Sequence, residues 1–189
     1  MTIQDLRKQF RKTLKSGIHG LCSSPYEEGQ EPGDQLSEDQ IRRRLKLIQP
    51  YTKWIRSFSC TEGNELIPII AKEMGLSTLT GAWLGSNPEK NEREVKSLIE
   101  LANKGFVDIA AVGNEVLYRG DLTEEELLKN IYSVKDALTD IKVPVGYVDA
   151  YYEFEERPEI TDACDVIFNF YNITFSPYNS FHPIIFFTI

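Results

Sequence analysis

Apolar runs of strand length alternate with longer helical patterns along most of this 189-residue chain, and this alternation limits the folds available to it. Strands that alternate with helices are typical of βαβ units, whose strands form one parallel sheet. The pattern therefore predicts an α/β fold with about six βα units. The expected strands are 18–23, 54–59, 77–84, 107–113, 143–148 and 166–170, and the expected helices are 38–48, 65–74, 88–102, 124–139 and 160–163.

Helix-capping patterns separate these elements and leave one long loop. Ser37 with Gln40, and Thr123 with Glu126, have the spacing of capping boxes at helix N-termini. Because the helix after the fourth strand begins with its own cap at Thr123, residues 114–122 are expected to form a separate loop. Long loops at the carboxyl ends of parallel strands are where α/β proteins build functional sites.

The fourth expected strand ends in an asparagine–glutamate pair. The run V-D-I-A-A-V-G-N-E occupies 107–115, so Asn114 and Glu115 lie at the carboxyl end of a buried strand. Glycoside cleavage needs a carboxylic acid that protonates the leaving oxygen, and an amide can hydrogen-bond a sugar hydroxyl. On spacing alone, Glu115 fits a solvated loop carboxylate equally well. Asn114 likewise fits a turn residue that tolerates an unusual backbone angle.

Charge and cysteine content exclude several classes of protein. The formal net charge of −8 and the isoelectric point near 4.9 argue against nucleic acid as a partner, because phosphate contacts need basic patches. Cys22, Cys60 and Cys164 are odd in number and widely spaced, which predicts reduced, partly buried thiols. The sequence has no spacing typical of metal ligands, nucleotide-binding glycines or a Ser-His-Asp set, so neither a metal nor another cofactor is expected.

Residues 1–16 are expected to form an amphipathic helix ahead of the main domain. Ile3, Leu6, Phe10 and Leu14 recur at helical spacing among five basic residues. This pattern is typical of a helix packed on a domain, and a helix on a membrane surface is the alternative. The segment lacks the continuous apolar core and the small-residue cleavage site of a signal peptide. The sequence therefore predicts a cytoplasmic protein, with extracellular location by a non-classical route as the alternative.

The composition changes after Asp165, the last charged residue. Residues 168–189 are expected to form a divergent tail, uncharged and rich in Phe and Tyr, after a main domain at 17–167. Asn, Ser and Pro interrupt the apolar positions of the tail. It therefore lacks the run of about 20 apolar residues that a transmembrane helix needs.

Six segments give the chain a resemblance to a known enzyme family. They are G-I-H-G-L-C-S-S-P-Y-E-E-G at 17–29, W-I-R-S-F-S at 54–59, L-T-G-A-W-L at 79–84, V-D-I-A-A-V-G-N-E-V-L-Y-R-G-D-L-T at 107–123, V-P-V-G-Y-V-D-A-Y-Y at 143–152 and D-A-C-D-V-I at 162–167. By these segments the sequence resembles glycoside hydrolase family 17, the β-1,3-glucanase group, in its bacterial form. The part G-N-E-V-L-x-R-G is the most specific.

The resemblance implies a fold and an activity. The fold is a (β/α)8 TIM barrel, incomplete here because a full barrel takes about 250 residues. The activity is that of a retaining glycoside hydrolase that cleaves O-glycosidic bonds of β-1,3-glucan. The implied partner is therefore a β-glucan polysaccharide or oligosaccharide.

The resemblance also assigns the catalytic pair. Glu115 matches the family's acid/base, and Asn114 matches the asparagine before it, which can bond the sugar 2-hydroxyl. The family's nucleophile is a glutamate at the end of the seventh strand, in a pattern like E-x-G-W-P that this sequence does not contain. The expected result is an impaired hydrolase. The alternatives are a non-catalytic truncated fragment, a carbohydrate-binding remnant, or part of a barrel completed by another chain.

Four further residues are expected to contact the glucan. Tyr26, Trp83 and Tyr118 fall at strand ends or in the following loops, where aromatic rings can pack on sugar C–H faces. Packing in the core or at the rim is the alternative for each. Arg56 lies inside the second strand, where a buried guanidinium needs a carboxylate partner. It is expected either to face the active-site acids or to make a structural ion pair. Asp149, at the end of the fifth strand, is another carboxylate on the same face.

Overall fold

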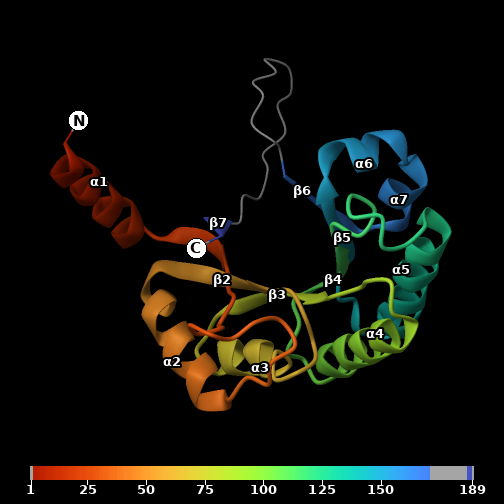
Figure 1. Ribbon diagram of the computed structural model, residues 1–189, viewed down its shortest axis with the longest axis horizontal. Coiled ribbons are helices and arrows are strands. Elements are labelled where there is room, and N and C mark those ends of the chain that lie inside the picture. The colour runs from red at the N-terminus through yellow and green to blue at the C-terminus, as the bar shows by residue number, and fades with distance from the viewer. Residues whose placement is uncertain (1, 171–186, 189) are drawn as a thin grey trace.

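A computed structural model describes residues 2–170 and 187–188 (Figure 1). Six parallel strands form a curled sheet in the order β6-β5-β4-β3-β2-β1, so strands consecutive in the chain are neighbours in space. This arrangement confirms the expected α/β fold of the incomplete (β/α)8 barrel type. The strands are β1 (Ile18–Cys22), β2 (Thr52–Ser57), β3 (Ser77–Ala82), β4 (Ile109–Asn114), β5 (Val145–Ala150) and β6 (Val166–Phe170).

Helices follow the strands in turn and cover the outer side of the curled sheet (Figure 1). Short 3-10 turns precede β2 and β5. The helices of this layer are α2 (Glu38–Ile48), α3 (Leu66–Glu73), α4 (Pro88–Asn103), α5 (Glu124–Leu138), α6 (Tyr151–Glu156) and α7 (Pro158–Ala163), and the turns are η1 (Gln49–Tyr51) and η2 (Thr139–Ile141).

A two-residue strand, β7 (Phe187–Thr188), pairs in parallel with β1 at Leu21 and Cys22. Six βα units alone would leave both outer strands of the sheet unpaired. At Leu21 and Cys22, however, the outer edge of β1 is paired with β7. Residues 171–186 of the expected tail lie outside the described residues.

The sheet separates an outer core from a smaller inner cluster. The outer core lies between the strands and the helices. The inner cluster contains Leu79, Ala111, Val148 and Phe168, one residue from each of the strands β3 to β6. Arg56 of β2 pairs with Leu79 in register, and residues paired in register occupy the same face of a sheet. Arg56 therefore lies on the inner face.

The two expected capping boxes differ in outcome. The Thr123 hydroxyl accepts from the Glu126 N–H, and the Glu126 carboxylate accepts from the Thr123 N–H, so this box is confirmed. Ser37 caps α2 by accepting from the Gln40 N–H, but the Gln40 side chain donates instead to the Pro25 carbonyl. The second box is therefore only half formed, because the loop after β1 takes the Gln40 side chain.

Helix α1 (Ile3–Ser16) projects away from the rest of the fold (Figure 1). It has no buried residue, and Ile3, Leu6 and Phe10 remain 70%, 49% and 60% exposed. The expectation that its apolar face packs on the domain is therefore wrong for these three residues, whereas Leu14, near the end of the helix, is half-buried. The spacing correctly predicted a helix, but spacing does not specify what covers an apolar face.

Candidate active site

A β-bulge near the end of β4 sets the direction of the Asn114 side chain. From Ala111 to Asn114, β4 advances three residues while β5 advances two, from Gly146 to Val148. One extra residue reverses the face that the following side chains occupy. Asn114 therefore pairs with Val148 of the inner cluster and lies on the inner face of the sheet. Strict alternation from Ala111 would have placed Asn114 on the outer face.

Gly113 makes this bulge possible. Its φ of +92° lies in the left-handed region that glycine adopts without penalty. A Cβ at this position would stand 2.7 Å from Val116 Cγ2 and 3.3 Å from Tyr147 Cε2. Both the backbone angle and the close packing therefore require a glycine immediately before Asn114.

Glu115 follows with a left-handed backbone of its own, at φ +55°. Its N–H donates to the Val148 carbonyl at 2.8 Å, and its carbonyl accepts from the Arg119 N–H at 2.9 Å. These bonds hold a conformation that non-glycine residues adopt rarely and usually at functional positions. Glu115 is half-buried rather than fully solvated. Asn114 does not have a positive φ, so its interpretation as a strained turn residue is not needed.

Arg56 reaches over β3 and donates a hydrogen bond to Asn114 Oδ1. Its guanidinium carbon also lies 4.6 Å from the centre of the Phe58 ring. Burial lowers the pKa of Arg56, while Cys22 and the negative charge of Glu115 act in the opposite direction. Arg56 thus faces the Asn114–Glu115 pair, as the first of its two expected roles requires, rather than making a structural ion pair within the described residues.

Arg119 joins the ends of β3 and β4. It donates to the carbonyl oxygens of Asn114 and Leu84, the latter at 2.9 Å, and pairs with Asp121 at 2.6 Å. The Arg119 guanidinium carbon lies 4.6 Å from the centre of the Trp83 ring, a cation–π geometry. One residue therefore positions both the backbone before Glu115 and the half-buried Trp83 ring.

A buried tyrosine–aspartate pair holds the other side of the Glu115 loop. The Tyr147 hydroxyl donates to Asp149 Oδ2 and accepts from the Leu117 N–H at 3.0 Å. The Tyr118 N–H also reaches Asp149 Oδ2, at 3.4 Å, and the Ala150 N–H donates to Oδ1 at 2.7 Å. Because Asp149 is 0% exposed, this carboxylate anchors the loop and is not presented to a ligand.

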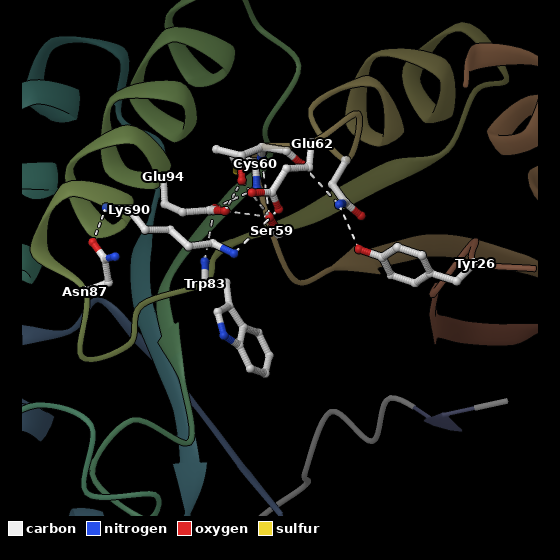
Figure 2. A network of polar contacts seen from close by, with 10 residues as sticks. Tyr26, Ser59, Cys60, Glu62, Trp83, Asn87, Lys90 and Glu94 are labelled. Atoms are coloured by element: carbon white, nitrogen blue, oxygen red, sulfur yellow. Dashed lines mark hydrogen bonds and ion pairs between the residues drawn. The ribbon is translucent and has the colours of Figure 1, made fainter. Parts of the chain in front are cut away.

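A second buried carboxylate, Glu94 of α4, organises the loop after β2 and the end of β3 (Figure 2). Glu94 Oε2 accepts from the N–H groups of Cys60 at 2.7 Å and Trp83 at 3.1 Å. Glu94 Oε1 accepts from the hydroxyls of Ser59 and Thr61, both at 2.5 Å. Glu94 is 0% exposed, so four donors compensate one buried charge.

Tyr26 is tied to the same network rather than to Glu115. The Asn64 side-chain amide donates both to the Tyr26 hydroxyl and to the Thr61 carbonyl, each at 3.1 Å (Figure 2). Tyr26 also packs against the outer core around Leu21. Its position therefore fits the packing alternative at least as well as glucan contact.

Tyr118 stands at the exposed rim of the Glu115 loop. Its side chain is 55% exposed and meets the Tyr152 ring edge-on, with ring centres 6.5 Å apart. Tyr151 and Tyr152 are themselves in edge contact at 5.6 Å. The result is a cluster of three tyrosines carried by the loop after β4 and by α6.

The structure thus brings Arg56 to Asn114 directly and Trp83 to the same strand end through Arg119, and leaves Tyr26 and Tyr118 at the periphery. Arg119 has no assigned role in the sequence interpretation, although it stands in the G-N-E-V-L-x-R-G segment. Glu94 gives no sequence signal, because a glutamate within a polar helical pattern normally faces solvent.

Comparison with known proteins identifies the family. Residues 20–174 match the sequence profile of the BtgE/BtgC glycoside hydrolase domain. The chain belongs to this family. The match includes the Asn114–Glu115 pair, Arg56 and Trp83, and it confirms the resemblance to glycoside hydrolase family 17.

Curated members of this glucanase group are longer than the chain. The chain is 28% identical over 141 residues to "Glucan 1,3-beta-glucosidase BGL2" of Candida albicans, covering 66% of the chain and 46% of that protein. It is 26% identical over 146 residues to "Glucan endo-1,3-beta-glucosidase btgC" of Emericella nidulans, covering 69% of the chain and 22% of that protein. The chain therefore spans less than half the length of these relatives.

A solved structure has the same fold. It is an active-site mutant of the Rhizomucor miehei β-1,3-glucanosyltransferase in complex with laminaritriose, and it superposes with a TM-score of 0.69. The identity is 24%, and the match covers 82% of the chain and 57% of that structure. The family's barrel fold is thus present here in part.

Proposed function

We propose that this chain carries the acid/base half of a retaining β-1,3-glucan-active site. Glu115 is the general acid that protonates the glycosidic oxygen, and Asn114 binds the sugar 2-hydroxyl. The observation that carries the proposal is the bulge, because it brings Asn114 to the inner face next to Glu115. The glucan specificity is inferred from relatives that are named as β-1,3-glucosidases.

The contact with Arg56 gives Asn114 a defined orientation. An amide oxygen that accepts from a guanidinium leaves the amide NH₂ group as the donor for other partners. That NH₂ group can donate a hydrogen bond to the oxygen of a sugar hydroxyl. Arg56 is therefore proposed to act on substrate through Asn114.

Two aromatic residues supply the apolar part of the proposed glucan contact. Trp83 is half-buried, and Arg119 fixes its ring at the end of β3. The Tyr118 ring is exposed on the loop that carries Glu115. Rings of this kind can pack on the C–H faces of sugar units.

The second catalytic carboxylate is the missing component of this proposal. Retaining glycosidases hold their two carboxyl groups about 5–5.5 Å apart. Asp149, at the end of β5, is another carboxylate that holds this loop, but it is buried and already accepts three hydrogen bonds. With no E-x-G-W-P pattern in the sequence, we expect glucan binding with little hydrolysis.

Chemical rescue tests the role of Glu115 without the second carboxylate. Azide and an aryl β-1,3-glucobioside with a poor leaving group are incubated with the chain and with Glu115→Gln. Azide attacks the anomeric carbon, the bond to the leaving oxygen breaks, and Glu115 supplies the proton to that oxygen. We expect an α-glycosyl azide from the unsubstituted chain, and a rate at least about a hundredfold lower from Glu115→Gln. Equal rates from both proteins would remove Glu115 from the role of acid.

A further inference from the structure

Helix α1 is a well-formed helix whose apolar face is largely exposed in the described part of the chain, where only Leu14, near the end of the helix, is half-buried. The Thr2 hydroxyl and the Asp5 carboxylate form a capping box at its start, and Gly17, with φ +86°, follows its end. Ile3 and Phe10 are more than half exposed. Isolated helices of this length are only marginally stable in water, so a surface that covers the apolar face would also stabilise the helix.

The charge of α1 opposes that of the rest of the protein. The helix contains five basic residues and one acidic residue, a net charge of +4, whereas the whole chain carries −8. The remainder of the chain therefore carries −12. This segregation means that α1 and the barrel prefer surfaces of opposite sign.

The basic and apolar residues are arranged around the helix in an order that suits a flat anionic surface. At about 100° per residue, Ile3, Leu6, Phe10 and Leu14 share one face. Arg7 and Arg11 border one side of this face, whereas the three lysines lie on the far side of the helix. Arginine side chains beside an apolar stripe can keep their stems against it while their guanidinium groups contact phosphates.

Other occupants of this face fit less well. Two copies of α1 packed on each other would bring two charges of +4 together, which is unfavourable. A nucleic acid would use the basic residues but would leave Ile3, Leu6 and Phe10 in water. No helix in the described residues is long and apolar enough to cross a membrane.

We propose that α1 docks this protein reversibly onto an anionic lipid bilayer. The apolar face enters the boundary between headgroups and acyl chains, Arg7 and Arg11 contact lipid phosphates, and the lysines add longer-range attraction to the anionic surface. The acidic barrel then stays away from the anionic surface and keeps the inner face of the sheet in water. This inference rests on α1 alone and does not depend on the proposed glucan activity.

Co-sedimentation of the full chain with lipid vesicles tests the proposal. One set of vesicles is phosphatidylcholine alone, and the other contains about one third phosphatidylglycerol to supply negative charge. We expect sedimentation only with the anionic vesicles, and release when the salt concentration is raised. No sedimentation with either set, or equal sedimentation with both, would overturn the proposal.

Substitutions of apolar and of basic residues in α1 separate the apolar and the electrostatic contributions to lipid binding. We expect Phe10→Gln to weaken binding to anionic vesicles about tenfold or more, because the largest apolar side chain is lost. Arg7→Glu with Arg11→Glu should abolish binding, and Gln9→Ser, at a position that is neither basic nor apolar, should leave it unchanged. Unchanged tryptophan fluorescence confirms that the barrel is intact in every variant. Equal binding by Phe10→Gln and the unsubstituted chain would contradict the proposal.

Two further measurements exclude the rival occupants. The proposal expects the chain to sediment as one species at all concentrations without lipid. A dimer that Phe10→Gln converts to monomer would instead assign the face to a second copy and overturn the lipid assignment. Binding of a double-stranded oligonucleotide that Phe10→Gln does not weaken would overturn it in favour of a basic nucleic-acid surface.

Discussion

Arg56 of β2 holds the side-chain oxygen of Asn114 on β4, two strands away, across the inner face of the sheet. The contact exists because two independent features direct both side chains inward. Register with Leu79 directs Arg56, and the bulge at Gly113 directs Asn114. The backbone conformation of Gly113 therefore decides whether Asn114, the residue before the proposed acid, lies on the inner face of the sheet.

Substitution of Arg56 should weaken glucan binding through Asn114. In Arg56→Lys the charge remains, but the shorter amine loses the fixed guanidinium geometry toward Oδ1. We expect the affinity for a β-1,3-linked glucose oligomer to fall about tenfold, measured by titration calorimetry. Arg42→Lys on α2, where Arg42 makes only exposed ion pairs, is the matched control and should change nothing. An equal loss in both variants would contradict a specific role for Arg56.

Two glycines with similar backbone angles should respond differently to alanine. Gly105 has φ +80° and nothing within 4 Å of an added Cβ, so Gly105→Ala should cost about 1 kcal/mol from backbone strain alone. Gly113→Ala adds the 2.7 Å approach to Val116 and should cost about 3 kcal/mol or more. Urea unfolding gives both free energies. Similar costs at the two positions would show that the packing around the bulge is looser than described.

Removal of the Glu94 carboxylate should loosen the ends of β2 and β3 together. Glu94→Ala leaves the Cys60 and Trp83 N–H groups without their acceptor and should cost about 3–5 kcal/mol. Glu94→Gln keeps an acceptor oxygen and should cost less, about 1–2 kcal/mol. Urea unfolding measures both, and the Trp83 emission should shift in Glu94→Ala. The exposed neighbour Glu92→Ala is the control and should be nearly neutral.

The thiol of Cys164 should become reactive only at high pH. Burial raises its pKa to about 11, with the charges of Lys135 and Asp165 acting against each other. At pH 8 its thiolate fraction, and hence its alkylation rate by iodoacetamide, should be about a hundredfold below that of an ordinary thiol. The rate should rise tenfold per pH unit until about pH 11. Cys164→Ser removes this phase, and a plateau near pH 9 would contradict the assignment.

The raised pKa of Cys164 also predicts how the free energy of unfolding changes with pH. The folded state holds the neutral thiol more firmly than the unfolded state does, because the folded pKa is raised from 9.0 to about 11. The neutral Cys164 thiol therefore makes its full contribution to the free energy of unfolding below pH 9.0, and this contribution is lost as the pH rises through about 11. Cys164→Ser should remove this part of the alkaline decline in the free energy of unfolding.

Local signals in the sequence predict the order of strands and helices and most of their bounds. Thr123 and Glu126 are an example, because a capping box depends only on residues three positions apart. Ser37 and Gln40 have the same spacing, but Pro25, distant in the chain, takes the Gln40 side chain. Local patterns predict a contact only where no distant residue competes for it.

The site is predictable in its residues but not in its geometry. Asn114 and Glu115 follow from a strand end and a family motif. The bulge at Gly113 does not follow, because one glycine in a strand pattern fits a bulge, a bend or close packing equally well. The burial of Glu94 and the exposure of the apolar face of α1 could not be predicted for one reason: burial depends on the element that packs against a residue, and helical spacing does not specify that element.

The central claim is that the inner-face pair Asn114–Glu115 forms a site for β-1,3-glucan, and titration of one variant tests it most directly. A β-1,3-linked glucose pentamer is titrated into the unsubstituted chain and into Asn114→Ala, with Asn103→Ala on the exposed end of α4 as control. We predict binding by the unsubstituted chain and by the control, and a loss of about tenfold or more in Asn114→Ala. Undetectable binding by the unsubstituted chain, or equal affinity in Asn114→Ala, would contradict the claim.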